Sequence, residues 1–207
     1  MKLLTLISTF AIASGIAITS ACSSGTTNPN TPTVNDAKAA TNNALANTQA
    51  VPNKEEDAPA SVKAAFPDAQ SFTKQHKDIP KDAIADMEKD TGGKVPDTDH
   101  HSYLAFSTTG GARKQIGAAT VVTASGKELV IVYENKGGSP YIKEVRVEGV
   151  PAAFLAQFAG KGHDDEFSVG SEIKLNGVDE ATAKAIALAI RIDAVTMQTL
   201  YGSAHSH

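Results

Sequence analysis

The sequence predicts an α+β domain, in which one face of an antiparallel sheet of about four strands is covered by N-terminal helices and a long C-terminal helix. Two observations carry this prediction. Runs rich in β-branched residues, divided by short turn signals, occupy the middle of the chain, and helical spacing of apolar residues flanks them on both sides. A net charge of −4 without any basic run argues against a nucleic-acid partner, because such surfaces need clustered lysine and arginine.

Residues 1–22 have the layout of a lipoprotein signal peptide: one lysine, an apolar stretch, and small residues ending at Cys22. Cys22 is the only cysteine, so no internal disulfide can form. One interpretation makes Cys22 a stray residue of a discarded signal. In the other, "ITSAC" resembles a bacterial lipobox, whose cysteine becomes the new N-terminus and carries acyl chains such as palmitate. Each buried CH₂ group then contributes about 0.8 kcal/mol to membrane anchoring. Because Ser23 follows, a Gram-negative cell would send the protein to the periplasmic face of the outer membrane.

Residues 23–57 are rich in Ser, Thr, Asn, Ala and Pro and contain no aromatic residue. Such a segment buries too little apolar surface to offset its ordering entropy, so we expect a flexible tether. The folded domain is predicted over residues 58–202, followed by a disordered tail at 203–207.

Two helices are predicted at the start of the domain, over residues 58–66 and 79–93. Pro80 suits the first turn of the second helix, and the Gly92-Gly93 pair is a stop signal. The four expected strands come next, at residues 102–108, 115–124, 128–134 and 141–149, and their short connections predict an antiparallel meander.

Helical patterns return in the last third of the chain. Residues 150–161 place Phe154, Leu155 and Phe158 on one stripe. The final helix is predicted to begin after Asp179, a good N-cap residue. Its apolar face is formed by Ala183, Ile186, Ala187, Ile190, Val195, Met197 and Leu200.

The order of these segments resembles the FMN-binding domain family of the periplasmic subunits of Rnf and Nqr electron-transport complexes. "VKAAFPDAQSF" is similar to the family's opening helix, Phe-Pro and polar strand, and "GKELVIVYENKGGSPYIKEVRV" is similar to its hairpin. "FLAQFAGK" resembles the family's Phe-Leu-x-Gln-Phe-x-Gly-Lys. The resemblance spans most of residues 58–202. It implies a flavin, electron transfer and a redox protein partner.

The family's flavin is attached to a threonine in a Ser-Gly-Ala-Thr segment that opens the last helix. Here "NGVDEATAKAI" occupies that place, so the resemblance implies cofactor-binding roles for Gly177, Asp179, Glu180 and Thr182. Asp179 or Glu180 stands at the acceptor position, and the family's Glu-Thr-Pro-Gly stretch is missing. The expected flavin is therefore FMN held non-covalently. The residues alone also support a simpler interpretation, in which Asp179 and Glu180 cap the helix themselves.

Other segments suggest ion binding. Arg113 and Lys114 follow the Gly110-Gly111 turn and could hold an anion, although basic, glycine-rich hairpin tips are common. "DTDHH", "GHDDE" and the terminal "HSH" contain metal-ligating residue types. We interpret "DTDHH" as a polar loop leading into a strand, where adjacent histidines point to opposite sides, "GHDDE" as a solvated loop and "HSH" as a frayed tail, and we predict no metal site. The members of these segments are Asp97, Asp99, His100, His101, His163, Asp164, Asp165, Glu166, His205 and His207.

Two functions remain open from the sequence. The first is an extracytoplasmic, membrane-anchored lipoprotein with an FMN-binding-like domain linked to electron transfer. The second is a non-redox ligand- or protein-binding module that kept the fold and lost the cofactor. No nucleophile–base arrangement is recognisable, so an electron carrier or binding protein is favoured over a turnover enzyme.

Overall fold

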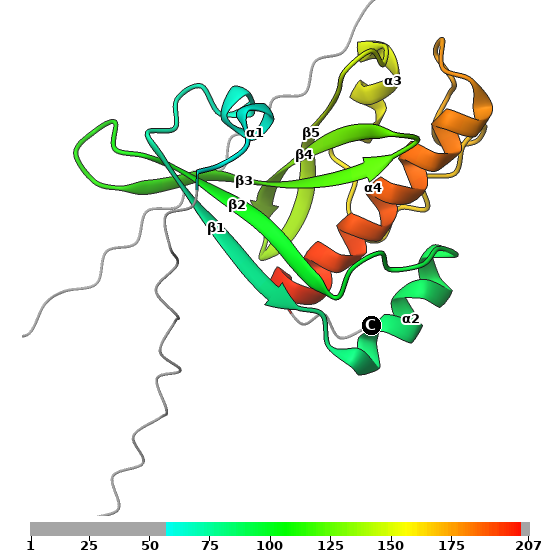
Figure 1. Ribbon diagram of the computed structural model, residues 1–207, viewed down its shortest axis with the longest axis horizontal. Coiled ribbons are helices and arrows are strands. Elements are labelled where there is room, and N and C mark those ends of the chain that lie inside the picture. The colour runs from blue at the N-terminus through cyan, green and yellow to red at the C-terminus, as the bar shows by residue number, and fades with distance from the viewer. Residues whose placement is uncertain (1–56, 204–207) are drawn as a thin grey trace, which may run out of the picture. The chain divides into compact units, whose positions relative to one another are not determined.

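The computed structural model describes residues 57–203 and has the α+β architecture that the sequence predicts (Figure 1). Cys22 and most of the expected tether and tail lie outside the described residues. The helices are α1 (Ala60–Ala65), α2 (Lys81–Thr91), α3 (Ala152–Leu155), the 3₁₀ helix η1 (Ala156–Phe158) and α4 (Glu180–Tyr201). The strands are β1 (Ser71–Asp78), β2 (Asp99–Ser107), β3 (Lys114–Ala124), β4 (Lys127–Lys136) and β5 (Ser139–Val147).

The sheet has five strands in the order β1-β2-β3-β4-β5, and each neighbouring pair is antiparallel. The predicted meander is therefore confirmed, with one strand more than the four we expected. The additional strand is β1, whose sequence "SFTKQHKD" is mostly polar and lacks a β-branched apolar run. A strand at the sheet edge whose side chains are only partly buried needs little apolar surface, which explains its weak sequence signal.

Helices cover both faces of the sheet, not the single face that we expected. In β4, alternate side chains point to opposite sides, so Leu129 and Ile131 belong to one core and Val130 and Val132 to another. The larger core lies under α3, η1 and α4. The smaller core is covered by α1, whose Phe66 packs on the other face.

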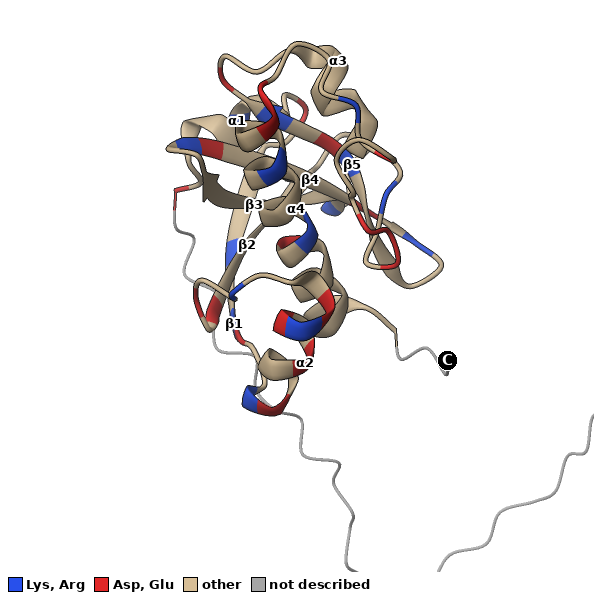
Figure 2. Ribbon diagram, turned by 90° about the vertical axis from the view of Figure 1, so that its right-hand side faces the viewer, with Lys and Arg blue, Asp and Glu red and all other residues tan. Residues whose placement is uncertain are grey.

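Helix α2 connects β1 to β2 and lies beside α4 (Figure 1). Gly92 ends it in the left-handed conformation, with φ of 70°, as the sequence predicts. Figure 2 shows acidic and basic residues interspersed over the exposed sides of α2 and α4, where Arg191 lies 3.6 Å from Asp90. Within residues 57–203, no helix has both the length and the apolar character needed to cross a membrane.

Candidate functional site

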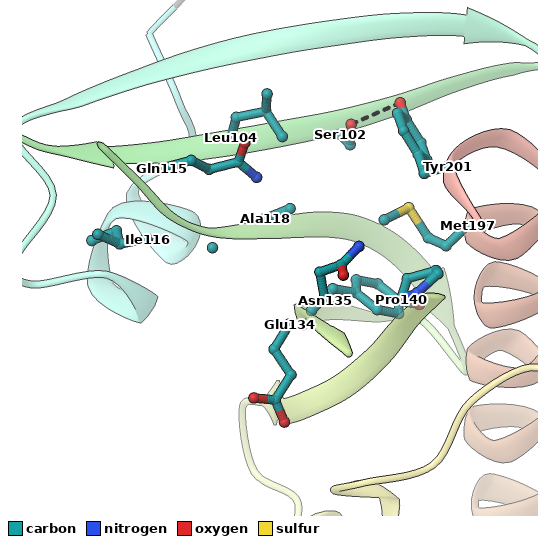
Figure 3. Close-up of a pocket in the computed structure, with 12 residues that line it drawn as sticks. Ser102, Leu104, Gln115, Ile116, Ala118, Glu134, Asn135, Pro140, Met197 and Tyr201 are labelled. Atoms are coloured by element: carbon teal, nitrogen blue, oxygen red, sulfur yellow. Dashed lines mark hydrogen bonds between the residues drawn. The ribbon is translucent and has the colours of Figure 1, made fainter. Parts of the chain in front are cut away.

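A pocket of about 420 Å³ opens on the face of the sheet that carries α4 (Figure 3). Strands β2, β3 and β4 form most of its lining, and β5 and the last two turns of α4 complete it. The lining residues are Ser102, Leu104, Gln115, Ile116, Gly117, Ala118, Tyr133, Glu134, Asn135, Pro140, Met197 and Tyr201. Below we call this the sheet pocket.

The shape of the sheet helps to open this pocket. The β2–β3 register shifts between Ala105 and Phe106, and the β4–β5 register shifts between Val132 and Tyr133. Both irregularities adjoin strand segments that line the pocket, and such bulges bend and twist a sheet locally. The sheet pocket therefore lies where the strands curve and where α4 ends.

Two hydroxyl groups meet at the helical wall of the pocket. Ser102 Oγ and Tyr201 Oη are hydrogen-bonded at 3.0 Å, as Figure 3 shows. Lys77 of β1 donates to the carbonyl of Leu200 at 2.7 Å, and its ammonium lies 4.1 Å from the centre of the Tyr201 ring. Burial raises the pKa of the Tyr201 phenol, although its bond to Ser102 opposes the shift. Tyr201 therefore stays protonated and able to donate a hydrogen bond at neutral pH.

Behind this wall, the carboxylate of Asp193 joins α4 to three strands. Asp193 Oδ2 accepts hydrogen bonds from Thr120 Oγ1 of β3 at 2.5 Å and from Tyr133 Oη of β4 at 2.7 Å. Asp193 Oδ1 lies 3.1 Å from His100 Nε2 of β2. The Asp193 side chain is only 3% exposed, and a buried carboxylate needs several donors to replace its hydration. This Asp193 network therefore fixes the position of α4 on the sheet.

The network also determines the hydrogen-bonding roles of Tyr133 and His100. Burial, followed by the negative charge of Asp193, raises the pKa of Tyr133 well above its ordinary value of 10.0, so Tyr133 remains a donor. His100 Nδ1 is buried and has no hydrogen-bond partner among the described residues. A proton on that nitrogen would be unsatisfied. The geometry thus assigns His100 the tautomer in which Nε2–H donates to Asp193.

Arg113 lies beside the sheet pocket. Its guanidinium stacks on Phe106 with Cζ 3.4 Å from the ring centre, and its Nη2 donates to Thr73 Oγ1 at 3.2 Å. Phe106 is the register partner of Gln115, and Thr73 is the register partner of Leu104. Because directly opposed residues of antiparallel strands share a face, Arg113 lies on the same face as these two pocket residues.

Lys114 is the next residue in the chain, and it is the register partner of Ser107. Successive strand residues point to opposite faces, so Lys114 is directed away from the face of Gln115. The structure therefore separates the two cations that the sequence analysis grouped together.

The predicted flavin-attachment segment lies at the opposite end of α4. Asp179 is the N-cap, as predicted, and its Oδ1 accepts a hydrogen bond from the backbone N–H of Thr182 at 2.9 Å. Glu180 forms an ion pair with Lys184 at 2.6 Å. The fifteen-residue separation of Thr182 and Met197 corresponds to about 22 Å along the helix. The helix start and the sheet pocket are therefore separate places.

This helix start is unfavourable for an anion because it already carries two acidic side chains. The hydrogen bond from Thr182 lowers the pKa of Asp179 below its ordinary value of 3.8, so Asp179 is ionised at neutral pH. A second carboxylate, Glu180, follows in the first turn. Gly177 has a φ of 90°, and an added Cβ would contact Pro151 at 3.6 Å. The segment thus has the structure of a self-capped helix, in which acidic side chains take the place that a phosphate would need.

The residues of the "FLAQFAGK" motif hold the chain that leads into α4. Phe154, Leu155 and Phe158, which the sequence places on one stripe, are buried in the larger core. The Gln157 side chain donates to the carbonyl of Lys174 at 2.8 Å and accepts from its N–H at 2.7 Å. This two-way contact gives Gln157 a structural role, so a bound cofactor is not needed to explain the glutamine of the motif.

The "GHDDE" acids make local contacts. Asp165 accepts from Lys161 Nζ at 3.0 Å and from the N–H of Gly162 at 2.8 Å, and Glu166 accepts from Ser168. His163 lies 3.1 Å from Asp164. These contacts order the loop and do not converge on a common point.

The "DTDHH" histidines point to opposite faces of β2, as expected for neighbouring strand residues. His100 joins the Asp193 network on the α4 face, whereas His101 lies beside Asp99 and His76 on the other face. Asp97 accepts a hydrogen bond from the N–H of Asp99. His205 and His207 lie outside the described residues.

Sequence patterns did not reveal the central polar members of this site, and they identified Met197 only as part of the apolar face of the last helix. The polar members are Ser102, Thr120, Tyr133, Asp193 and Tyr201. Asp193 could have been noticed, because it is an isolated acid on the face formed by Ile186, Ile190 and Met197. A charged residue at a core position of a helix indicates a buried partner.

No family model, no curated protein and no solved structure matches this chain.

Proposed function

We propose that this domain is an extracytoplasmic, membrane-anchored binding module whose ligand occupies the sheet pocket. The ligand is a small molecule with a flat, partly apolar body and an anionic group. The observation that carries this proposal is the pocket itself, next to Arg113 on the same face.

The lining supports an amphipathic ligand. Leu104, Ile116 and Met197 offer apolar contacts, and Gln115 and Asn135 bring side-chain amides. Ligand sites commonly combine apolar walls with a few polar groups and have volumes of about 300–1,000 Å³. The sheet pocket, at about 420 Å³, falls in that range.

Arg113 supports the anionic group. Stacking on Phe106 holds its guanidinium in one orientation, and only Thr73 accepts a hydrogen bond from it among the described residues. A guanidinium has five N–H donors, so donors remain for a carboxylate or phosphate.

FMN is the specific candidate ligand, because the sequence resembles a flavin-binding family. The amides and apolar side chains of the sheet pocket suit the two edges of a flavin ring, and Arg113 suits its phosphate. The acidic start of α4, at Asp179 and Glu180, does not suit a phosphate. A bound flavin would supply electron transfer to a redox protein partner. Without a flavin, the same pocket serves a non-redox binding function.

Fluorescence titration of FMN against the full-length chain in detergent tests the proposal. Ile116→Glu adds a charge at the pocket, whereas Leu175→Glu adds one near the start of α4; the two wild-type residues are 37% and 38% exposed. We expect Ile116→Glu to weaken FMN binding at least about tenfold and Leu175→Glu to leave it unchanged. The reverse pattern would assign FMN to the helix start and refute the sheet pocket.

Riboflavin, which lacks the phosphate, tests the role of Arg113. Arg113→Ala should weaken FMN binding about tenfold, or about 1.4 kcal/mol, and leave riboflavin binding unchanged. Lys114→Ala is the matched control, and we expect no change. If neither the wild-type chain nor any variant quenches the fluorescence of FMN or riboflavin, the electron-transfer function is refuted. Other flat anionic molecules are then the candidate ligands.

We also propose that lipid on Cys22 anchors the protein at the cell envelope, at the periplasmic face of the outer membrane in a Gram-negative cell. The support is the lipobox-like sequence before a solitary cysteine. Cys22→Ala should move the protein from the membrane fraction to the soluble fraction. Unchanged membrane partition of that variant would refute the lipid anchor.

A further inference from the structure

Three metal-ligating side chains meet on the sheet face opposite α4, where β1 ends and β2 begins. They are His76, Asp99 and His101, which we call the His-Asp-His cluster. His76 and His101 are direct register partners in the antiparallel ladder, and Asp99 is two residues before His101 on the same face. The backbone pairing therefore brings these three side chains together.

Both imidazoles approach the same carboxylate oxygen. His101 Nε2 lies 2.8 Å from Asp99 Oδ2, and His76 Nδ1 lies 3.4 Å from it. The two rings are 4.2 Å apart between their centres and meet edge to face. One ligand atom from each residue lies within 4.8 Å of the other two. Such convergence of three side chains on one point differs from the dispersed acids of the "GHDDE" loop.

We propose that His76, Asp99 and His101 bind a divalent transition-metal ion of the Zn²⁺ class. Two imidazole nitrogens and one carboxylate oxygen form a donor set that suits Zn²⁺, Cu²⁺ or Ni²⁺, whereas Ca²⁺ and Mg²⁺ prefer oxygen ligands. The negative charge of Asp99 offsets part of the ion's charge. Asp78, the register partner of Asp99, adds a second carboxylate to this end of the same face.

The geometry requires only side-chain movement. In a tetrahedral site with bonds of 2.0–2.1 Å, ligand atoms lie about 3.3 Å apart. The side chains of His76, Asp99 and His101 are 50%, 45% and 39% exposed, so they have room to close this small difference. The sheet keeps their backbones in register throughout. Three protein ligands leave a fourth position open to water or to a donor group of another molecule.

Zn²⁺ titration of the full-length chain, in competition with a chromogenic chelator, tests this site. The wild-type chain should bind one Zn²⁺ tightly. His76→Ala/His101→Ala should lose at least about 100-fold in affinity, because changes to mere supporting residues of metal sites already cost about 10–100-fold. The same titration with His205→Ala/His207→Ala is the matched control, since it also removes two imidazoles, and its affinity should be unchanged.

Asp99→Asn provides a second variant that keeps the side-chain shape and removes the charge. It should weaken Zn²⁺ binding about tenfold, and it decides the result if the double variant fails to fold by circular dichroism. Zn²⁺ should also raise the Tm of the wild-type chain and of the tail variant, but not that of the double variant. The proposal is overturned if the wild-type chain shows no saturable binding, if the tail variant loses the ion, or if Asp99→Asn and the double variant both bind like wild type.

Discussion

The two ends of α4 each place an aspartate where it accepts hydrogen bonds, but with different consequences. Near the start, Asp179 is exposed and accepts from Thr182 of its own helix. In the second half of the helix, Asp193 is buried and accepts from Thr120 and Tyr133 of two separate strands. Asp179 satisfies the helix alone, whereas Asp193 connects the helix to the sheet. The same residue type thus serves secondary structure at one end of α4 and tertiary structure at the other.

The causes of the pKa shifts also differ between the surroundings of Asp179 and those of Asp193. The pKa of Asp179 is lowered by a backbone N–H that its carboxylate accepts, in contact with solvent. Around Asp193, burial is the main influence, and it raises the pKa of Tyr133. Water screens the first interaction and is excluded from the second. Substitutions at the two ends should therefore differ strongly in their effect on stability.

The largest expected effect is that of Asp193→Ala. This change leaves the hydroxyls of Thr120 and Tyr133 and the N–H of His100 buried without their acceptor. We expect the free energy of unfolding to fall by about 3–5 kcal/mol, measured by urea denaturation. Asp90→Ala is the control, because its contact with Arg191 is at the surface, and it should have little effect. A loss at Asp193 as small as that at Asp90 would remove the distinction between the two ends.

An intermediate effect is expected for Tyr201→Phe, at the wall of the sheet pocket. The buried Ser102 hydroxyl loses its partner, while the ring still packs under Lys77. The free energy of unfolding should fall by about 1 kcal/mol. Tyr103→Phe, on the opposite face of β2, is the matched control. Equal losses in the two variants would show that the Ser102–Tyr201 bond contributes nothing specific.

The smallest effect is expected for Asp179→Ala, which removes the N-cap of α4. The Tm should fall by about 2 °C at pH 7, because one N–H loses its partner at a solvated helix end. Asp179 has a lower pKa in the folded state, so its contribution is present above the ordinary value of 3.8 and is lost as the pH falls through the lowered pKa. The difference in Tm between the wild type and the variant should thus shrink as the pH falls from 3.8 through the lowered pKa, and it should vanish below that pKa. A difference that persists there would assign the effect to packing instead of charge.

Much of the fold could be predicted because its signals are local. The run around Leu129 and Ile131 has the composition of a buried strand, and Gly92 is a stop signal that needs no knowledge of the rest of the chain. The residue pattern alone did not reveal strand β1, and only the family resemblance implied a polar strand there. The residues of β1 are mostly polar, and α2 lies between β1 and its partner β2 in the chain. Local periodicity cannot report such a partner.

The position of α1 was also beyond the sequence. The sequence predicts a helix over residues 58–66, but either side of the sheet could receive it. Gly117 lets Phe66 pack on this face of the sheet, because a Cβ at position 117 would lie 2.6 Å from the Phe66 ring. The close approach of Phe66 to β3 thus depends on a glycine that gives no structural signal of its own in the strand sequence.

The sequence by itself determined the β2–β5 part of the meander, the helices and the capping of α4 by Asp179, because each depends on residues a few positions apart. Only the tertiary structure decided that Asp193 is bonded to three strands, that the sheet pocket opens near Met197, and that His76 joins Asp99 and His101. These groups come from elements far apart in the chain. Strand register and the docking of α4, which arise from burial over the whole domain, bring them together.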